Sequence, residues 1–289
     1  MYSRSDPVGA TRAGVEAVWG RRMPPGLLER GPSENTHTQN RPGGRRGNAI
    51  MNSPAATGYS PSEETRSELV EALRALLPAD GTAFAILSVG EAKPGDLHPE
   101  EAALISPSAV ATKRTSFTLG RNAAAQTLRA IGIVPAPPVL QGKGKNPLWP
   151  DQVVGSITHC EPWTISVVAR ASAAKALGVD LEDVRRVQNP DIGEVICTRN
   201  EMEWIAGSED QLGSLIMVFS AKEAMYKAYY PFCRRYFDFT DAELAWDPAG
   251  GGFCGHLLTD LDKDHPRGHQ FRVSCQRVGS LVLSLLIEA

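Results

Sequence analysis

The chain has 289 residues, 42% of them hydrophobic, and a formal net charge of −3, which suits a globular protein of one large or two small domains. Residues 1–50 hold eight arginines and four acidic residues, a charge of +4, so the remainder carries −7 and bulk nucleic-acid binding is not expected. No apolar run approaches the roughly 18 residues that span a bilayer. The five cysteines form no C-x-x-C pair, which argues against zinc and for reduced thiols in a cytoplasmic protein.

The N-terminal segment differs in composition from the rest. Residues 1–58 are rich in Arg, Gly, Pro, Ser and Asn and show no sustained helical or strand period, so we expect a disordered tail. Met51 is a plausible alternative translation start. The tail has no apolar core of a secretory signal. We divide the remainder into an N-terminal lobe, residues 59–175, and a C-terminal lobe, residues 176–289.

Helices and strands alternate from Ser62 onward. The N-terminal lobe is expected to hold a helix that starts at Ser62 and stops before Pro78, a strand at 82–89, a helix at 108–131 and a strand pair at 156–169. In the C-terminal lobe we expect a strand at 176–182, helices at 191–206 and 212–230, and strands at 242–246, 270–276 and 280–287. Each lobe therefore ends in a hairpin, at 156–169 and at 271–287. This faint duplication predicts an α+β fold, a pseudodimer of two similar lobes.

Two carboxylates alternate with aliphatic residues in the first strand of the C-terminal lobe, in the sequence Ala-Leu-Gly-Val-Asp-Leu-Glu-Asp-Val at 176–184. Residues two apart in a strand point to the same face, so Asp180 and Glu182 project together while Val179 and Leu181 enter the core. Two close like charges need a neutralising cation, and Mg²⁺ suits oxygen ligands. The alternative is a solvated acidic face without a metal.

A second charged group lies in Phe-Ser-Ala-Lys-Glu-Ala-Met-Tyr-Lys-Ala at 219–228. We expect Lys222, Glu223 and Lys227 near the start of a helix. Ser220 and Glu223 fit a capping box, and Glu223 with Lys227 fits an ordinary i,i+4 ion pair, so the helix alone has a structural explanation. Together with Asp180 and Glu182, however, it supplies the carboxylates and lysines for Mg²⁺-assisted chemistry at a diphosphate.

These two segments resemble the signature of the 4′-phosphopantetheinyl transferases, in the branch that contains the activating enzyme of enterobactin synthesis. A third matching block is Gly-Ser-Ile-Thr-His-Cys at 155–160, preceded by Pro147 and Trp149-Pro150. A fourth, looser block is Lys113-Arg114 followed by Gly120-Arg121. The four blocks occur in the family's order over residues 80–245.

The resemblance implies a reaction and a cleft. Such enzymes move the phosphopantetheine arm of coenzyme A to a serine of an apo acyl or peptidyl carrier protein and release 3′,5′-ADP, with coenzyme A between two lobes. Asp180, Glu182 and Glu223 would hold Mg²⁺. Glu223 would also take the serine proton, and Lys222 and Lys227 would neutralise phosphate oxygens.

The resemblance also assigns residues to coenzyme A. His159 would contact the 3′-phosphate, with Ser156 or Thr158 nearby as hydroxyl donors. Arg121 would act with Lys113 or Arg114; Arg114 and Arg121 are seven residues apart and share a helix face. Lys145 is nearer the family position than Lys143. Without the resemblance, the basic residues could equally form a solvated helix face, and a lone histidine at a strand end is usually structural or merely exposed.

We therefore expect a monomeric, Mg²⁺-dependent phosphopantetheinyl transferase for biosynthetic carrier proteins, with no nucleic-acid or membrane partner. Two alternatives stay open. One is a Mg²⁺-dependent hydrolase that cleaves the diphosphate of a coenzyme A-like ligand with the same carboxylates. The other is a non-catalytic coenzyme A-binding module, which would not need the carboxylates at all.

Overall fold

A computed structural model describes residues 61–186 and 192–289. The expected tail at 1–58 and the alternative start at Met51 lie outside the described residues. Ser62 caps the first described helix as expected, because its Oγ accepts a hydrogen bond from the Thr65 amide at 3.1 Å. The first half contains α2 (Glu63–Leu76), β1 (Thr82–Ser88), α3 (Pro99–Ala102), α4 (Ala111–Ala130), β2 (Leu140–Gln141), β3 (Pro147–Leu148), β4 (Val153–Cys160) and β5 (Trp163–Arg170).

The second half follows the expected order with two differences. It contains β6 (Ala176–Asp183), α5 (Gly193–Ile196), α6 (Arg199–Ala206), α7 (Gln211–Cys233), β7 (Ala242–Asp247), β8 (Gly252–Leu257), β9 (Gln270–Val278) and β10 (Leu281–Glu288). The helix expected at 191–206 is two helices, because Thr198 caps a new one. Strand β8 was missed, since its glycines lower strand propensity. Gly255 allows β8 to lie against Phe271: an added Cβ would be 2.3 Å from that ring.

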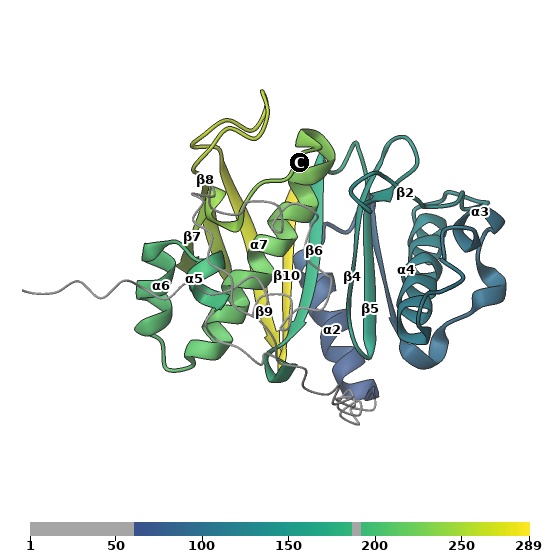
Figure 1. The fold of residues 1–289 in the computed structure, drawn as a ribbon, viewed down its shortest axis with the longest axis horizontal. Coiled ribbons are helices and arrows are strands. Elements are labelled where there is room, and N and C mark those ends of the chain that lie inside the picture. Colours follow the sequence, from purple (N-terminus) through teal and green to yellow (C-terminus); the bar gives the residue numbers. More distant parts are fainter. Residues whose placement is uncertain (1–60, 187–191) are drawn as a thin grey trace, which may run out of the picture.

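The first three strands follow the same order in the two sheets. The N-terminal sheet has the order β1-β5-β4, and the C-terminal sheet begins β6-β10-β9 and continues with β8 and β7. In each sheet the first strand pairs antiparallel with the second strand of the lobe's final hairpin. One long helix packs on each sheet, α4 on the first and α7 on the second (Figure 1). The structure is therefore α+β, as expected, with a repeated strand–helix–hairpin order.

Two apolar layers hold this arrangement together. On one face of β6, Leu177, Val179 and Leu181 pack with Leu69 and Leu73 of α2 and with apolar residues of β5 and β10, so this core includes strands of both sheets. On the other face of the C-terminal sheet, α7 packs over β6, β9 and β10. The aliphatic residues of β6 enter the core as expected, but the opposite face of the strand is buried as well. None of the described helices is long and apolar enough to cross a membrane.

Helix α7 crosses β6 in direct backbone contact at Gly178. A Cβ at this position would lie 1.9 Å from the Ala224 carbonyl oxygen and 2.7 Å from the Ala228 amide nitrogen. Both are backbone atoms of α7, so no side chain can move aside. Because Gly178, Asp180 and Glu182 share one face of β6, this contact also places both acids beneath α7.

We therefore expect Gly178→Ala to lower the free energy of unfolding by at least about 1 kcal/mol, because the added Cβ must displace the backbone of α7. Urea unfolding monitored by circular dichroism measures the change. Gly90→Ala is the matched control, because a Cβ there meets nothing within 4 Å, and it should stay within about 0.5 kcal/mol of the parent protein. Equal stability of the two variants would contradict the close contact between α7 and β6.

Candidate active site

The two acids of β6 are buried rather than solvated. Asp180 is 2% exposed and Glu182 is 7% exposed, both on the face that α7 covers. The solvated acidic face considered from the sequence is therefore wrong. Buried carboxylates need hydrogen bonds or a cation to offset the loss of water.

Lys227 of α7 supplies one such cation. Its Nζ lies 2.5 Å from Asp180 Oδ1, 3.2 Å from the Val179 carbonyl oxygen and 3.4 Å from Thr158 Oγ1. The lysine side chain is 26% exposed. Lys227 thus links α7, β6 and β4, with its three donors directed at protein oxygens. Its expected contact with a phosphate stays a prediction, and the ion pair with Asp180 is an additional role.

Side-chain hydroxyls connect the two lobes where β4 and β6 lie side by side (Figure 1). Ser156 Oγ accepts a hydrogen bond from the Val179 amide at 3.1 Å, and Thr158 Oγ1 accepts one from the Leu181 amide at 3.2 Å. Thr158 Oγ1 also lies 3.2 Å from Asp180 Oδ1. Ser156, expected as a coenzyme A contact, is only 3% exposed. This placement disagrees with that expectation, because its hydroxyl joins the lobes inside the protein.

Lys222 also differs from its expected position. Its side chain is 0% exposed, and Nζ lies 2.7 Å from Glu201 Oε2 and within 3.0 Å of three carbonyl oxygens, those of Ile196, Phe239 and Ala242. Burial lowers the pKa of Lys222, and the Glu201 carboxylate opposes that shift. The expected phosphate contact is not compatible with this geometry, since the ammonium is enclosed by protein acceptors.

Glu223 is half-buried and lies one turn before Lys227, on the same side of α7. Neither residue is at a helix start, because α7 begins at Gln211 and Ser220 lies inside it. The expected position and the capping-box explanation are therefore both wrong. The three expected metal ligands, Asp180, Glu182 and Glu223, do not have all their ligand atoms within 4.8 Å of one another.

The donor chemistry at this place nevertheless fits a hard divalent cation. Asp180 Oδ2 is buried and has no hydrogen-bond partner among the described residues. A buried acceptor without a partner has lost its hydrogen bonds to water, which costs about 1–3 kcal/mol of folding free energy. A cation or a hydrogen-bond donor at this atom would remove that cost. Together with the carboxylates of Glu182 and Glu223, it offers the all-oxygen set that Mg²⁺ prefers.

The basic residues of α4 lie in two different environments. Arg121 is 6% exposed, its guanidinium lies 4.5 Å from the Phe117 ring centroid, and burial lowers its pKa to about 10. Its Nε has no hydrogen-bond partner among the described residues. Arg114 is exposed, and its guanidinium donates to the carbonyl oxygens of Ala109 and Pro107. Arg114 and Arg121 thus differ in burial although they share a helix face; Lys113 is exposed.

His159 is half-buried near the end of β4. Two residues earlier, Ile157 packs against α4, since a Cβ at Gly120 would be 3.3 Å from it. His159 therefore lies on the face of β4 that packs against α4, the helix that carries Arg121. The turn with Lys143 and Lys145, both exposed, packs on α7: a Cβ at Gly144 would overlap the Tyr230 hydroxyl. Basic residues of the first lobe are thus placed beside the helix that carries Glu223.

Sequence reasoning missed Glu201, which neutralises Lys222. A signal was present, because Thr198 and Glu201 form the capping box of α6. Glu201 Oε2 accepts the Thr198 amide at 2.7 Å and Oε1 accepts the Leu244 amide at 2.8 Å. A capping box does not predict burial, so its partner could not be inferred from the spacing.

Comparisons with known proteins identify the family of this chain. The sequence model described as "4'-phosphopantetheinyl transferase N-terminal domain" matches residues 100–169, and that described as "4'-phosphopantetheinyl transferase superfamily" matches residues 176–283. The second match contains Asp180, Glu182 and Glu223. Enterobactin synthase component D of Escherichia coli is 35% identical over 60% of this chain and 76% of the relative. The chain belongs to the 4′-phosphopantetheinyl transferase superfamily.

Two further relatives bear the family's name. The 4′-phosphopantetheinyl transferase Svp of Streptomyces mobaraensis is 39% identical over 56% of this chain and 66% of the relative. The 4′-phosphopantetheinyl transferase PptT of Mycobacterium tuberculosis is 33% identical over 56% of this chain and 71% of the relative. These comparisons confirm the expected family and the expected class of enzyme, a transferase. The family uses coenzyme A and acts on carrier proteins.

We expect Lys222→Met to destabilise the protein by about 3–5 kcal/mol, because Glu201 would be left buried without its cation. Thermal unfolding, followed together with coenzyme A binding at a temperature where the variant is folded, measures this. Lys175→Met, at an exposed lysine, should change neither quantity. A loss of coenzyme A affinity at unchanged stability would instead support the phosphate contact expected from the sequence.

Proposed function

We propose that the protein transfers the 4′-phosphopantetheine arm of coenzyme A to a serine hydroxyl of an apo carrier protein, releases 3′,5′-ADP, and acts as a monomer. The observation that carries this proposal is the buried Asp180 at the junction of β4, β6 and α7. Its Oδ1 accepts hydrogen bonds from Lys227 and Thr158, and its Oδ2 has no hydrogen-bond partner among the described residues. Such a carboxylate is held in place and keeps one oxygen for a ligand.

Asp180, Glu182 and Glu223 are the residues that would hold Mg²⁺. When bound, Mg²⁺ would act as a Lewis acid and stabilise charge on the diphosphate of coenzyme A. Lys227 fixes the carboxylate of Asp180 against α7 and β4 and partly offsets the repulsion between Asp180 and Glu182. The ion pair therefore supports a pre-positioned carboxylate on rigid elements.

Glu223 is the group that we assign to the serine proton. It is half-buried on the same side of α7 as Lys227, next to Ala224, where the helix contacts β6. The serine oxygen forms a bond to the phosphorus that bears the pantetheine arm. The bond from that phosphorus to the bridging oxygen breaks, and 3′,5′-ADP leaves with the electron pair. The serine proton goes to the Glu223 carboxylate, and no protein nucleophile is required.

The coenzyme A contacts that we propose lie on the α4 face of β4 and on the turn beside α7. His159 and Arg121 would hold the 3′-phosphate, and Nε of Arg121, which has no hydrogen-bond partner among the described residues, supports this assignment. Lys113 is a better candidate than Arg114, because the guanidinium of Arg114 already donates to two carbonyl oxygens. For the turn at 142–146 we propose Lys145, without a geometric reason to prefer it to Lys143.

One incubation separates the proposal from its alternatives. The purified protein is mixed with coenzyme A, Mg²⁺ and an apo carrier protein, and the carrier is weighed by mass spectrometry. A mass gain of one phosphopantetheine arm, dependent on the carrier serine, is the expected result. Release of 3′,5′-ADP without a carrier would instead favour the hydrolase, and coenzyme A binding without turnover the binding module.

In the same assay we expect Asp180→Asn to lower the transfer rate at least about 100-fold, equivalent to about 2.7 kcal/mol of transition-state stabilisation. The amide keeps the size and one oxygen acceptor for Lys227, so thermal unfolding should show a folded protein. Glu203→Gln is the matched control, since Glu203 pairs with Arg199 on the surface of α6 and should not affect transfer. Turnover near that of the parent protein at saturating Mg²⁺ would refute the role of Asp180.

A further inference from the structure

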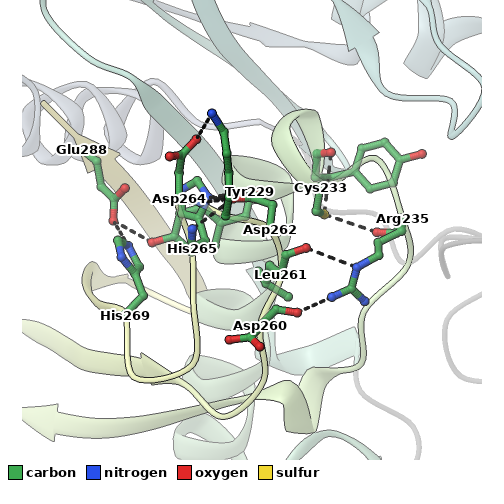
Figure 2. Close-up of polar contacts among 12 residues, drawn as sticks. Tyr229, Cys233, Arg235, Asp260, Leu261, Asp262, Asp264, His265, His269 and Glu288 are labelled. Carbon is green, nitrogen blue, oxygen red and sulfur yellow. Dashed lines mark hydrogen bonds and ion pairs between the residues drawn. The ribbon is translucent and has the colours of Figure 1, made fainter.

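A second polar cluster lies away from Asp180, where the connection from β8 to β9 meets the end of β10. His265 and His269 come from the connection and Glu288 from the last strand. Figure 2 shows the three side chains converging beside Tyr229 of α7. Their three candidate ligand atoms all lie within 4.8 Å of one another, and among the described residues no other group of three meets this condition.

The separation of two of these ligand atoms suits a tetrahedral metal. His269 Nε2 and Glu288 Oε1 are 3.3 Å apart, which is long for a strong hydrogen bond. Metal–ligand bonds of about 2.0–2.1 Å at tetrahedral angles place two ligand atoms about 3.3 Å apart. Two imidazole nitrogens and one carboxylate oxygen form a ligand set that Zn²⁺ accepts, whereas Mg²⁺ prefers oxygen alone.

The residues around the cluster orient its ligands. His265 Nδ1 lies 2.9 Å from Asp262 Oδ1 and 3.0 Å from Oδ2, so a proton on Nδ1 leaves the Nε2 lone pair for a metal. The Tyr229 hydroxyl donates to Glu288 Oε1 at 2.6 Å (Figure 2). Carboxylate–histidine pairs and hydrogen-bonded carboxylate ligands are the usual surroundings of protein zinc sites.

Packing restricts the histidine rings and leaves a path for a metal. The His265 side chain is 8% exposed and lies between the rings of Tyr229, at a centroid distance of 4.7 Å, and Phe232, at 5.1 Å. His269 and Glu288 are about one quarter exposed. A surface groove of about 590 Å³ is lined by Glu288 but by neither histidine, so the partial exposure of His269 and Glu288 is what gives an ion access to the cluster.

We propose that His265, His269 and Glu288 bind one Zn²⁺ ion in a site separate from that of Asp180. The expectation of no zinc rested on cysteine spacing alone, which does not consider histidine and carboxylate ligands. The ion joins the β8–β9 connection to the end of β10 and, through Tyr229, to α7. Three protein ligands leave a fourth position for water. The ion stabilises the folded protein because the ligands come together only on folding.

The test is a titration of untagged, metal-stripped protein with Zn²⁺ alone, in the presence of excess Mg²⁺. We expect one Zn²⁺ per chain by calorimetry and a rise in melting temperature that grows with Zn²⁺ concentration. Substitution by Co²⁺ should give the intense visible absorption of a tetrahedral site. None of these measurements depends on transfer activity.

Three variants and one control identify the ligands. His269→Ala and Glu288→Gln should each weaken Zn²⁺ binding at least about 100-fold, and Asp262→Asn, which removes no ligand, about 10–100-fold. His256→Ala, a histidine on β8 outside the three-ligand group, should bind as the parent does. Circular dichroism shows whether each variant is folded. Absence of Zn²⁺ binding in the parent protein, or equal binding by His269→Ala and His256→Ala, would overturn the proposal.

Discussion

The candidate site depends on the backbone contact between α7 and β6 at Gly178. Because no Cβ separates them, the Ala224 carbonyl of α7 approaches the strand to a distance that any side chain would prevent. This brings Lys227 within 2.5 Å of Asp180 and within reach of Thr158 on the other lobe. A wider gap would break the ion pair and separate Glu223 from the strand acids. One glycine thus determines how a helix and a strand present their charged side chains to each other.

Burial determines whether Lys222, Lys227 and Arg121 are available to contact a ligand. Lys222 and Glu223 are neighbours in sequence, but consecutive helical residues point about 100° apart, so Lys222 enters the core while Glu223 stays half-buried. Lys222 is surrounded by four oxygens, which offsets the cost of removing an ammonium from water. Lys227 is partly exposed and pairs with Asp180, and Arg121 is buried with one nitrogen that has no partner in the described part of the chain. Of the three, only Arg121 keeps a donor without a hydrogen-bond partner among the described residues, and only Lys227 is partly exposed.

The sequence predicted the order of elements and the alternation of β6, because both follow from hydrophobic periods and caps that act locally. It also placed Asp180 and Glu182 on one face of the strand, because residues two apart share a face; their role as metal ligands stays a prediction. The internal hydrogen bonds of Lys222 and Ser156 could not be predicted from the sequence. Their partners, Glu201 and the Val179 amide, belong to other elements of the fold. Strand β8 was missed since its glycines serve close packing on β9 and do not favour a strand by themselves.

Helix α7 has a different neighbour on each side. Lys227 and Tyr229 are two residues apart, about 200° around the helix, so they face nearly opposite directions. Lys227 contacts β4 and β6, whereas Tyr229 bonds to Glu288 at the end of β10. The ion pair between Lys227 and Asp180 limits how far α7 can move away from the sheet, and the hydrogen bond from Tyr229 to Glu288 limits its rotation. If Zn²⁺ holds Glu288 and the β8–β9 connection, it restrains the same rotation. Such a restraint would hold Glu223 and Lys227 in place relative to Asp180, although the two sites do not touch.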